Sequence, residues 1–375
     1  MKRWAGIARF GGVGDNLVAG SVLAPLKRMG YMTEVISSPP HHIVYLHNPY
    51  IDKLTVKVVE KDLPQGDMEA WQQWLASRAR EYDIFLHASH SMESRHAAFS
   101  TMTAFWWPQD YRRKMLAGSY LETAHDIIGV PHEFGPLFWT SDEEKEAAAS
   151  TKAQMGNKVV AWVLSGTRID KVFPSAPQAI GRIIKELGIP VVLLGSPSEK
   201  EYSMAEAIKE LVKNQNGTRD GLYSSVISPA VPEEQRTTVR PALALAQECD
   251  LVVTPDTGTA WAVAMEPMPK VVMMSHASVE NITKHWINTV TLHADPARVP
   301  CWPCHRLHNT IDTCVPNKEG NGAACISDIT VESIVAAVAN GLRRGERVIH
   351  AEAAFSLARR PTLQAGLHSD LRQQQ

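Results

Sequence analysis

The chain has 375 residues, and its 38 Lys and Arg against 40 Asp and Glu give a formal net charge of -2. This length predicts two domains of α/β size, and the near-neutral balance argues against nucleic acid as a partner. No apolar run approaches the roughly 18 residues that cross a bilayer, and the first residues lack the apolar region and cleavage site of a signal peptide. We therefore expect a cytoplasmic protein.

The first part of the chain alternates short apolar runs with helix-like stretches. Strands are predicted from these runs at residues 4–10, 33–37, 43–46, 54–59 and 83–89. Helical spacing of apolar residues predicts a helix over 17–30 that is closed by Gly30. The acidic, alanine-rich stretch 140–157 predicts a helix and a linker.

A second series of elements follows this linker. It predicts a strand at 158–166, a helix at 176–188, a strand at 190–196 and a helix at 199–214, and the alternation continues to residue 276. Strands and helices that alternate at this spacing indicate a parallel sheet with right-handed crossovers. We therefore expect an α/β protein with two doubly wound, Rossmann-like domains that face a cleft. The predicted parts are 1–150, 151–346 and a C-terminal tail, 347–375.

A glycine-rich loop, RFGGVGDNLVAG, follows the first predicted strand at residues 9–20. Gly12 and Gly14 supply half of a dinucleotide fingerprint, but Leu17 stands where the third glycine belongs. This departure argues against a nicotinamide site. The glycines then serve a tight turn, and Asp15 either caps the helix that follows or faces the cleft as a base.

Three segments of the second series have residues suited to a nucleotide. Asp256, Thr257 and Gly258 open a helix after a strand, which either binds an anion or only caps the helix. Arg168 and Lys171 lie in the loop 165–174, where they are phosphate partners or solvated cations.

The third of these segments is LLGSPSEKE, at residues 193–201. Gly195 ends its strand, and Glu199 either accepts hydrogen bonds from ribose hydroxyls or simply begins a helix. The D-x-D signature of a metal-bound diphosphate is absent from the sequence. The pattern therefore favours a diphosphate site without metal, in which a helix dipole and a lysine stabilise the leaving group.

Six segments in chain order carry a resemblance to a known family. They are GGVGD near the start, NPYID at 48–52, DKVFP at 170–174, GSPSE at 195–199, DTGTA at 256–260, and CWPC followed by ACISDITVESI. With them the chain resembles, over nearly its whole length, the heptosyltransferase-like glycosyltransferases of family 9, which have the GT-B fold.

The resemblance implies an inverting transfer of a sugar from a nucleotide diphosphate sugar, with an ADP-sugar as first expectation, to a hydroxyl of a glycan or lipid-linked glycan acceptor. It implies that catalysis needs no cofactor and that the protein acts in lipopolysaccharide or other glycan synthesis. It leaves open a peripheral contact with the inner face of a membrane. Asp15 takes the role of general base and Lys171 that of the cation on the leaving diphosphate. The implied donor-binding residues are Gly14, Thr167, Arg168, Gly195, Glu199, Asp256, Thr257, Gly258, Thr259 and Trp261.

One position departs from the family. The family pattern is DTGxxH, and Trp261 stands at the histidine position. The resemblance therefore does not establish ADP-heptose as the sugar donor. Two other functions also stay open. These are a nucleotide-sugar epimerase of related fold and a non-catalytic module that binds a nucleotide or glycan.

Two further groups of residues are candidates for binding. Four thiols, Cys301, Cys304, Cys314 and Cys325, either hold a structural zinc ion or stay as partly buried thiols, with His305 and His308 as alternative ligands. On the acceptor side of the predicted cleft, His87, His90 and Arg95 follow a strand of the first domain. Trp106 and Trp107 either stack on a sugar or pack in the core.

Overall fold

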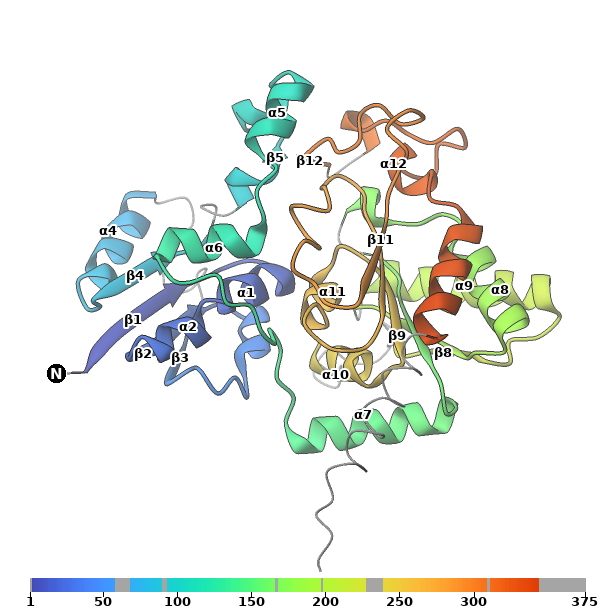
Figure 1. Ribbon diagram of the computed structural model, residues 1–375, viewed down its shortest axis with the longest axis horizontal. Coiled ribbons are helices and arrows are strands. Elements are labelled where there is room, and N and C mark those ends of the chain that lie inside the picture. Colours follow the sequence, from blue (N-terminus) through green and yellow to red (C-terminus); the bar gives the residue numbers. More distant parts are fainter. Residues whose placement is uncertain are drawn as a thin grey trace, which may run out of the picture.

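The computed structural model describes residues 2–57, 68–89, 93–165, 168–196, 198–226, 239–308 and 311–343. It has two parallel sheets side by side, each with helices packed on it (Figure 1). The predicted α/β class is therefore confirmed. The predicted tail 347–375 lies outside the described residues.

The first sheet has the strand order β3-β2-β1-β4, and all its pairs are parallel. Its strands are β1 (Arg3–Ala8), β2 (Tyr31–Ser37), β3 (Lys53–Val56) and β4 (Ile84–His87). Helix α4 (Met68–Ala79) precedes β4 along the chain. The apolar runs at 4–10, 33–37, 54–59 and 83–89 thus contain strands, although residues 58–59 are not described.

Two predictions for this first part are wrong. The predicted strand 43–46 lies in a 3-10 turn, η1 (His41–Tyr45), where the Tyr45 hydroxyl donates to the carbonyl of Asn16 at 2.7 Å. The predicted helix 17–30 is two helices, α1 (Val13–Gly20) and α2 (Leu23–Arg28). The break falls at Ser21, whose hydroxyl donates to the Val18 carbonyl at 2.6 Å and so competes with helical hydrogen bonding.

The second sheet has the order β11-β10-β9-β6-β7-β8 and is also parallel throughout. Its strands are β6 (Val160–Val163), β7 (Val191–Leu194), β8 (Leu222–Ser224), β9 (Leu251–Pro255), β10 (Lys270–Met273) and β11 (Thr289–Leu292). Its helices include α8 (Ala176–Leu187), α9 (Glu199–Asn216), α10 (Arg240–Glu248), α11 (Gly258–Ala262) and a helix at 331–343. The central strands β6, β7, β9 and β10 are buried along their whole length, as expected when helices cover both faces of a sheet.

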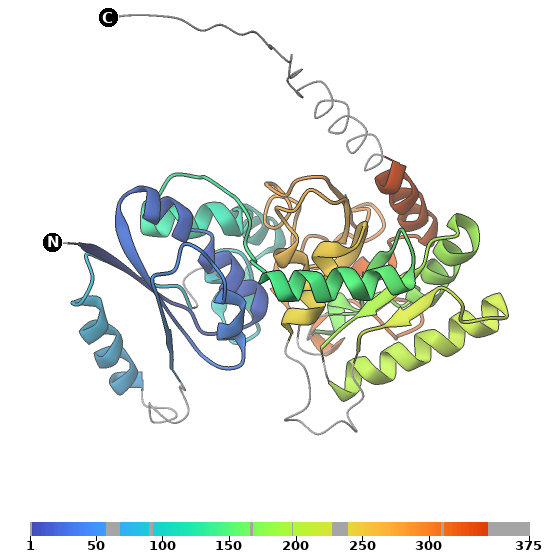
Figure 2. The ribbon, with the colours of Figure 1, turned by 90° about the horizontal axis from the view of Figure 1, so that it is seen from below.

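Helix α7 (Asp142–Met155) begins the second series and packs against α10 (Figure 2). Ser141 and Glu144 form a capping box at its N-terminus, with hydrogen bonds of 3.0 and 3.1 Å. The buried side chain of Arg240 donates to Glu144 at 2.6 Å, to the Trp139 carbonyl at 2.7 Å and to the Ile43 carbonyl at 2.8 Å. It thereby joins the first part, the linker and the second part. The predicted boundary at residue 150 falls within α7 and stays a prediction.

The second half has a hydrophobic core of its own, and another core spans the two halves. Its buried residues include Leu17, Val18 and Leu121 from the first part and Trp261, Met274, Ile282 and Trp286 from the second. Helices α1 and α11 pack directly on one another. We call this contact of α1 with α11 the seam.

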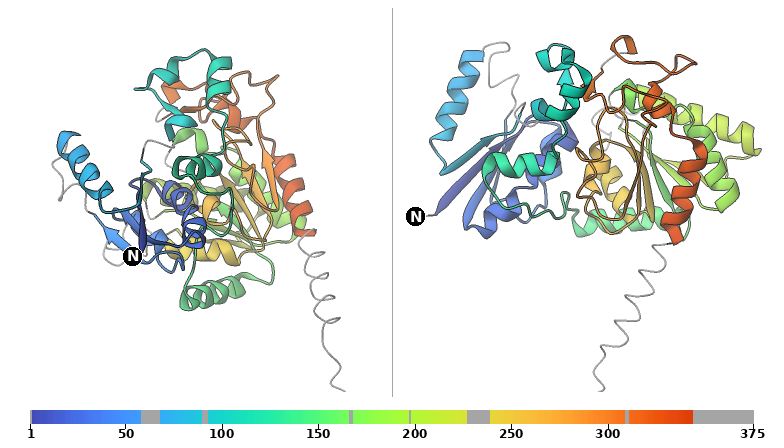
Figure 3. Two further views of the ribbon diagram at one scale, coloured as in Figure 1. Left: turned by 60° about the vertical axis from the view of Figure 1, so that its left-hand side comes forward. Right: turned by 45° about the horizontal axis from the view of Figure 1, so that its top comes forward.

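A second contact between the halves comes from the segment that leads to α6 (Tyr120–Ile128) (Figure 3). The strands β5 (Ala98–Phe99) and β12 (Arg306–Leu307) pair in parallel. After β5 come η3 (Thr103–Trp106) and α5 (Gln109–Met115). Arg113 donates to the carbonyls of Pro300 and Trp302 at 2.7 and 2.6 Å, and Arg112 donates to the carbonyl of Cys304. We call this set of arginine–carbonyl bonds the clasp.

None of the helices in the described ranges has the length and apolar character required to span a bilayer.

Candidate functional site

Two of the predicted motifs meet at one edge of the second sheet. Lys171 ends the turn η4 (Ile169–Lys171), which follows β6, and Asp256 directly follows β9. Because β6 and β9 are paired neighbours, the loops at their carboxyl ends lie together. The Lys171 amine donates to the Asp256 backbone carbonyl and lies 3.2 Å from its carboxylate. The structure thus brings together the predicted donor lysine and the predicted phosphate loop.

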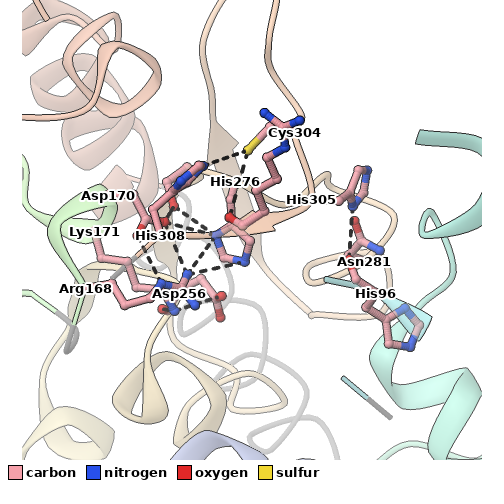
Figure 4. A network of polar contacts seen from close by, with 12 residues as sticks. His96, Arg168, Asp170, Lys171, Asp256, His276, Asn281, Cys304, His305 and His308 are labelled. Atoms are coloured by element: carbon pink, nitrogen blue, oxygen red, sulfur yellow. Dashed lines mark hydrogen bonds and ion pairs between the residues drawn. The ribbon is translucent and has the colours of Figure 1, made fainter. Parts of the chain in front are cut away.

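A buried polar network lies beside this pair, and Figure 4 shows it from close by. Arg168 donates to the two carboxylate oxygens of Asp170 at 3.0 and 3.2 Å. The same carboxylate accepts from the Ser275 hydroxyl at 2.9 Å and lies 3.2 Å from Nδ1 of His276. His276 Nδ1 is also 3.0 Å from the Arg168 guanidinium. Arg168 was predicted to bind the nucleotide sugar. Its guanidinium is already hydrogen-bonded to a carboxylate and an imidazole.

The sequence reasoning did not select Asp170, Ser275 or His276. Two signals were available, since Asp170 is the first residue of the DKVFP motif and the SH pair ends the apolar run KVVMMSH. Polar residues at the carboxyl ends of parallel strands are candidates for one common site. Nothing in the sequence pairs residues about a hundred positions apart, so the network itself needed the structure.

The charges of this site fix the protonation states of its members. Burial alone would raise the pKa of Asp170, but its hydrogen bonds with His276 and Arg168 and the charge of Arg168 hold that pKa well below its ordinary value. Burial and the Arg168 guanidinium lower the pKa of His276, which favours a neutral imidazole. For Asp256, burial is outweighed mainly by Lys171, and its pKa is lowered. Two carboxylates and two cations therefore balance in the site.

The helix α11 starts immediately after Asp256. The Thr257 hydroxyl accepts from the Ala260 amide at 3.4 Å, so Thr257 does cap the helix, as one of the two interpretations held. Thr257, Gly258 and Thr259 are all partly exposed. Trp261, in contrast, is only 5 % exposed, and its indole N–H donates to the Asp256 carboxylate at 3.2 Å.

The carboxylate of Asp15 lies on the first-domain side of the seam and is 40 % exposed. One of its oxygens accepts from the Gly12 amide at 3.0 Å, and the other lies 3.2 Å from the guanidinium of the buried Arg9. Gly14 touches the seam directly, because a Cβ built on it would lie 2.9 Å from Cδ1 of Trp261. Asp15 therefore caps α1, and its partly exposed carboxylate is held by Gly12 and Arg9.

The remaining predicted residues are placed less completely. Glu199 begins α9, Gly195 lies just after β7, His87 ends β4, and the exposed Arg95 ends η2 (Glu93–Arg95). The side chain of Glu199 lies outside the described part of the chain, as do Thr167 and His90. An acid that the sequence reasoning did not select, Glu201, is buried and accepts from the Ser165 hydroxyl at 3.0 Å.

Two neighbouring tryptophans, which lie just before α5, differ in exposure. Trp106 is 67 % exposed, and its indole N–H donates to the Ser100 carbonyl at 3.1 Å. Trp107 is half-buried and packs edge-on against Tyr111 at 5.1 Å between ring centroids.

The four predicted cysteine ligands line one open pocket, together with His308, Asp170 and His276. His308 Nε2 lies 3.7 Å from Sγ of Cys304. Burial raises the pKa of Cys304 to about 11 and that of Cys314 to about 12. Within the described ranges, no three His, Cys, Asp or Glu side chains are placed to hold a metal ion. His305 faces away, with its Nδ1 3.2 Å from the His96 carbonyl.

Two doubly wound parallel sheets side by side are the architecture of the GT-B fold. Residues 87–266 match the model of glycosyltransferase family 9 (heptosyltransferase). The resemblance of the sequence motifs is thereby confirmed. No curated protein matches the sequence.

Solved structures of the same fold cover most of the chain. A family 9 glycosyltransferase from Veillonella parvula has a TM-score of 0.60 at 13 % identity, with 92 % of this chain and 98 % of the other covered. The ADP-heptose lipopolysaccharide heptosyltransferase II of Escherichia coli has a TM-score of 0.60 at 15 % identity, with coverage of 92 % and 100 %. TibC, an iron-containing dodecameric glycosyltransferase from enterotoxigenic E. coli, has a TM-score of 0.51 at 12 % identity, with coverage of 92 % and 77 %.

Proposed function

We propose that the protein is an inverting, metal-independent glycosyltransferase that moves a sugar from a nucleotide diphosphate sugar to an acceptor hydroxyl. The observation that carries this proposal is the placement of the Lys171 amine beside Asp256, at the start of α11. A cation and the free N–H groups of a helix start are the two features that stabilise a departing diphosphate.

The proposed donor is an ADP-sugar. A heptosyltransferase of E. coli that shares the fold has been solved with ADP-2-deoxy-2-fluoro heptose, at 12 % identity and a TM-score of 0.53. In the proposal, Lys171 leaves Asp256 to meet the diphosphate, Thr257, Gly258 and Thr259 offer it their backbone amides, and Glu199 accepts from the ribose. The proposal also assigns contacts with the nucleotide sugar to Gly14, Thr167, Arg168 and Gly195.

The proposed base is Asp15. Its carboxylate takes the proton of the acceptor hydroxyl as that oxygen attacks the anomeric carbon from the face opposite the diphosphate. The bond to Arg9 and the bond to the Gly12 amide fix the carboxylate in place. The proposed acceptor is a glycan or lipid-linked glycan, and the residues assigned to it are His87, His90 and Arg95. The proposed place of the reaction is the cytoplasm, at the inner face of a membrane.

The test of this proposal begins with binding, because binding needs no acceptor. A thermal-shift and calorimetric screen of ADP-, GDP- and UDP-sugars should give a shift with the ADP compounds. Asp15→Asn should lower turnover about 10²- to 10⁴-fold and leave the ADP dissociation constant within twofold of wild type. Full turnover of the variant would remove Asp15 from the role of base.

Product analysis with the same nucleotide sugars, with and without acceptors, separates the other two functions. An isomerised or hydrolysed sugar that forms without any acceptor would indicate an epimerase. Binding without product under every acceptor would indicate a non-catalytic module. The absence of any shift would contradict all three functions.

The four cysteines of the pocket are proposed to hold a structural metal ion. Four thiols beside an imidazole are a donor set that zinc takes, and the iron in TibC makes iron a second metal to measure. Binding requires the side chains to turn toward one another, since they are not placed to hold an ion as they stand. Elemental analysis should find about one zinc or iron per chain, and Cys304→Ser should remove it. A metal content below about 0.1 per chain would contradict the proposal.

A further inference from the structure

Trp261 lies where the family has a histidine, and it is not open to a ligand. Its side chain is buried, and its indole N–H is used by the carboxylate of Asp256 at 3.2 Å. The other oxygen of the same carboxylate lies 3.2 Å from the Lys171 amine. Asp256 thus connects the indole to the lysine. A direct contact between Trp261 and a donor, as the sequence motif implied, does not fit this burial.

The ring of Trp261 also crosses the seam. It packs edge-on against Trp286, with 4.9 Å between ring centroids, and against Tyr120 of the first half at 6.3 Å. A Cβ on Gly14 would come within 2.9 Å of its Cδ1, so the backbone next to Asp15 rests on the indole. The position of the Asp15 loop relative to the second sheet therefore depends on the size of this ring.

We infer that Trp261 is a positioning residue that couples the two halves of the site. Its N–H holds Asp256, which in turn orients Lys171, and its ring fixes the distance between the Asp15 loop and α11. This inference rests on the proposed function for the roles of Asp15 and Lys171. It assigns Trp261 to the support of both residues and not to contact with the donor.

The physical reason lies in the charge of Asp256. While no donor is bound, its buried carboxylate is compensated chiefly by Lys171. When a diphosphate draws the Lys171 amine away, the Asp256 carboxylate still accepts a hydrogen bond from the indole N–H of Trp261, which is neutral and fixed in place. Without the indole N–H, the Asp256 carboxylate competes more strongly with the diphosphate for Lys171. Removal of the N–H alone should therefore weaken donor binding although the indole never touches the donor.

Trp261→Phe tests the indole N–H, because phenylalanine keeps an aromatic ring at the seam but has no N–H group. The matched control is Trp286→Phe, because Trp286 is also buried, touches Trp261, and has an indole nitrogen without a hydrogen-bond partner in the described structure. ADP titrated by calorimetry should bind Trp261→Phe about three- to tenfold more weakly than wild type. This is a part of the roughly 10- to 100-fold that one hydrogen bond to a charged group contributes, because the bond is already present before ADP binds. Trp286→Phe should stay within twofold. Equal affinities of the two variants would overturn this half of the inference.

Trp261→His tests the ring, because imidazole retains an N–H but fills less of the seam. Hydrogen–deuterium exchange of the peptide that covers residues 9–16 should be at least about tenfold faster in this variant than in Trp286→Phe. Unchanged exchange would overturn the second half. This measurement needs no ligand, so it decides the inference even if wild type fails to bind ADP, an outcome that would contradict only the proposed function.

Discussion

The buried carboxylate of Asp170 allows a quantitative test of the network beside Lys171. Asp170→Asn keeps the shape of the side chain and removes its charge, which leaves the guanidinium of Arg168 without a counter-ion at 3.0 Å. It also replaces an acceptor of the Ser275 hydroxyl at 2.9 Å by an amide. Breaking a buried, hydrogen-bonded ion pair from one side costs about 3–5 kcal/mol. For a domain of about 150–250 residues, this corresponds to a fall in Tm of about 6–20 °C.

The pH dependence provides a second measurement on the same variant. The pKa of Asp170 is lowered in the folded protein, while an aspartate in the unfolded chain titrates near about 3.9. Its contribution to stability is therefore complete above about pH 4 and is lost as the pH falls through the folded pKa. Asparagine does not titrate, so the difference in free energy of unfolding between wild type and variant should shrink below pH 4.

Thermal melts at pH 7 give Tm, and urea unfolding followed by tryptophan fluorescence at pH 3, 4, 5.5 and 7 gives the free energy of unfolding. Asp110→Asn is the control, because Asp110 is 100 % exposed and lies 3.8 Å from Arg113. Its Tm should move by less than about 2 °C. A change in Tm for Asp170→Asn as small as that of the control, or a difference that does not depend on pH, would show that the network does not stabilise the fold.

Two further predictions concern other buried features. Burial lowers the pKa of Lys270 to about 7, and its amine donates to the carbonyls of Glu266 and Met268 at 2.6 and 2.8 Å. In the unfolded chain, the Lys270 amine keeps its proton up to about pH 10.4. The free energy of unfolding of wild type relative to Lys270→Met should therefore rise by about 2–3 kcal/mol between pH 7 and 9.5 in urea titrations. A constant difference would contradict the lowered pKa. A Cβ on Gly258 would lie 2.6 Å from Cβ of Val13, so Gly258→Ala should force the seam apart and cost about 1–3 kcal/mol in thermal melts. Gly135→Ala, with nothing within 4 Å of its Cβ, should melt like wild type, and equal melting of both variants would refute the tight seam.

The strands were predictable because buried parallel strands are short apolar runs with no polar alternation. The same rule produced the wrong strand at 43–46, since four apolar residues in a row do not distinguish a strand from a buried turn. The break in the helix 17–30 depends on one side-chain hydrogen bond of Ser21, which periodicity does not detect.

The candidate site was predictable where residues follow neighbouring strands. Lys171 and Asp256 meet because β6 and β9 pair, and the topology of an alternating α/β chain implies this meeting. The partners of Asp170 and the contacts of Trp261 depend on side-chain packing across distant segments. A single sequence contains propensities and periodicities, and neither specifies which buried polar groups face one another.

The clasp has a consequence for how the sequence can drift. Arg112 and Arg113 donate to main-chain carbonyls of residues 300, 302 and 304 and not to side chains. Every amino acid offers the same carbonyl, so substitutions along this stretch that keep its backbone course leave the bonds intact. No other side chain replaces the fork of a guanidinium that reaches several carbonyls at once. These bonds therefore place no demand on the side chains of residues 300, 302 and 304, whereas they require a guanidinium at residues 112 and 113.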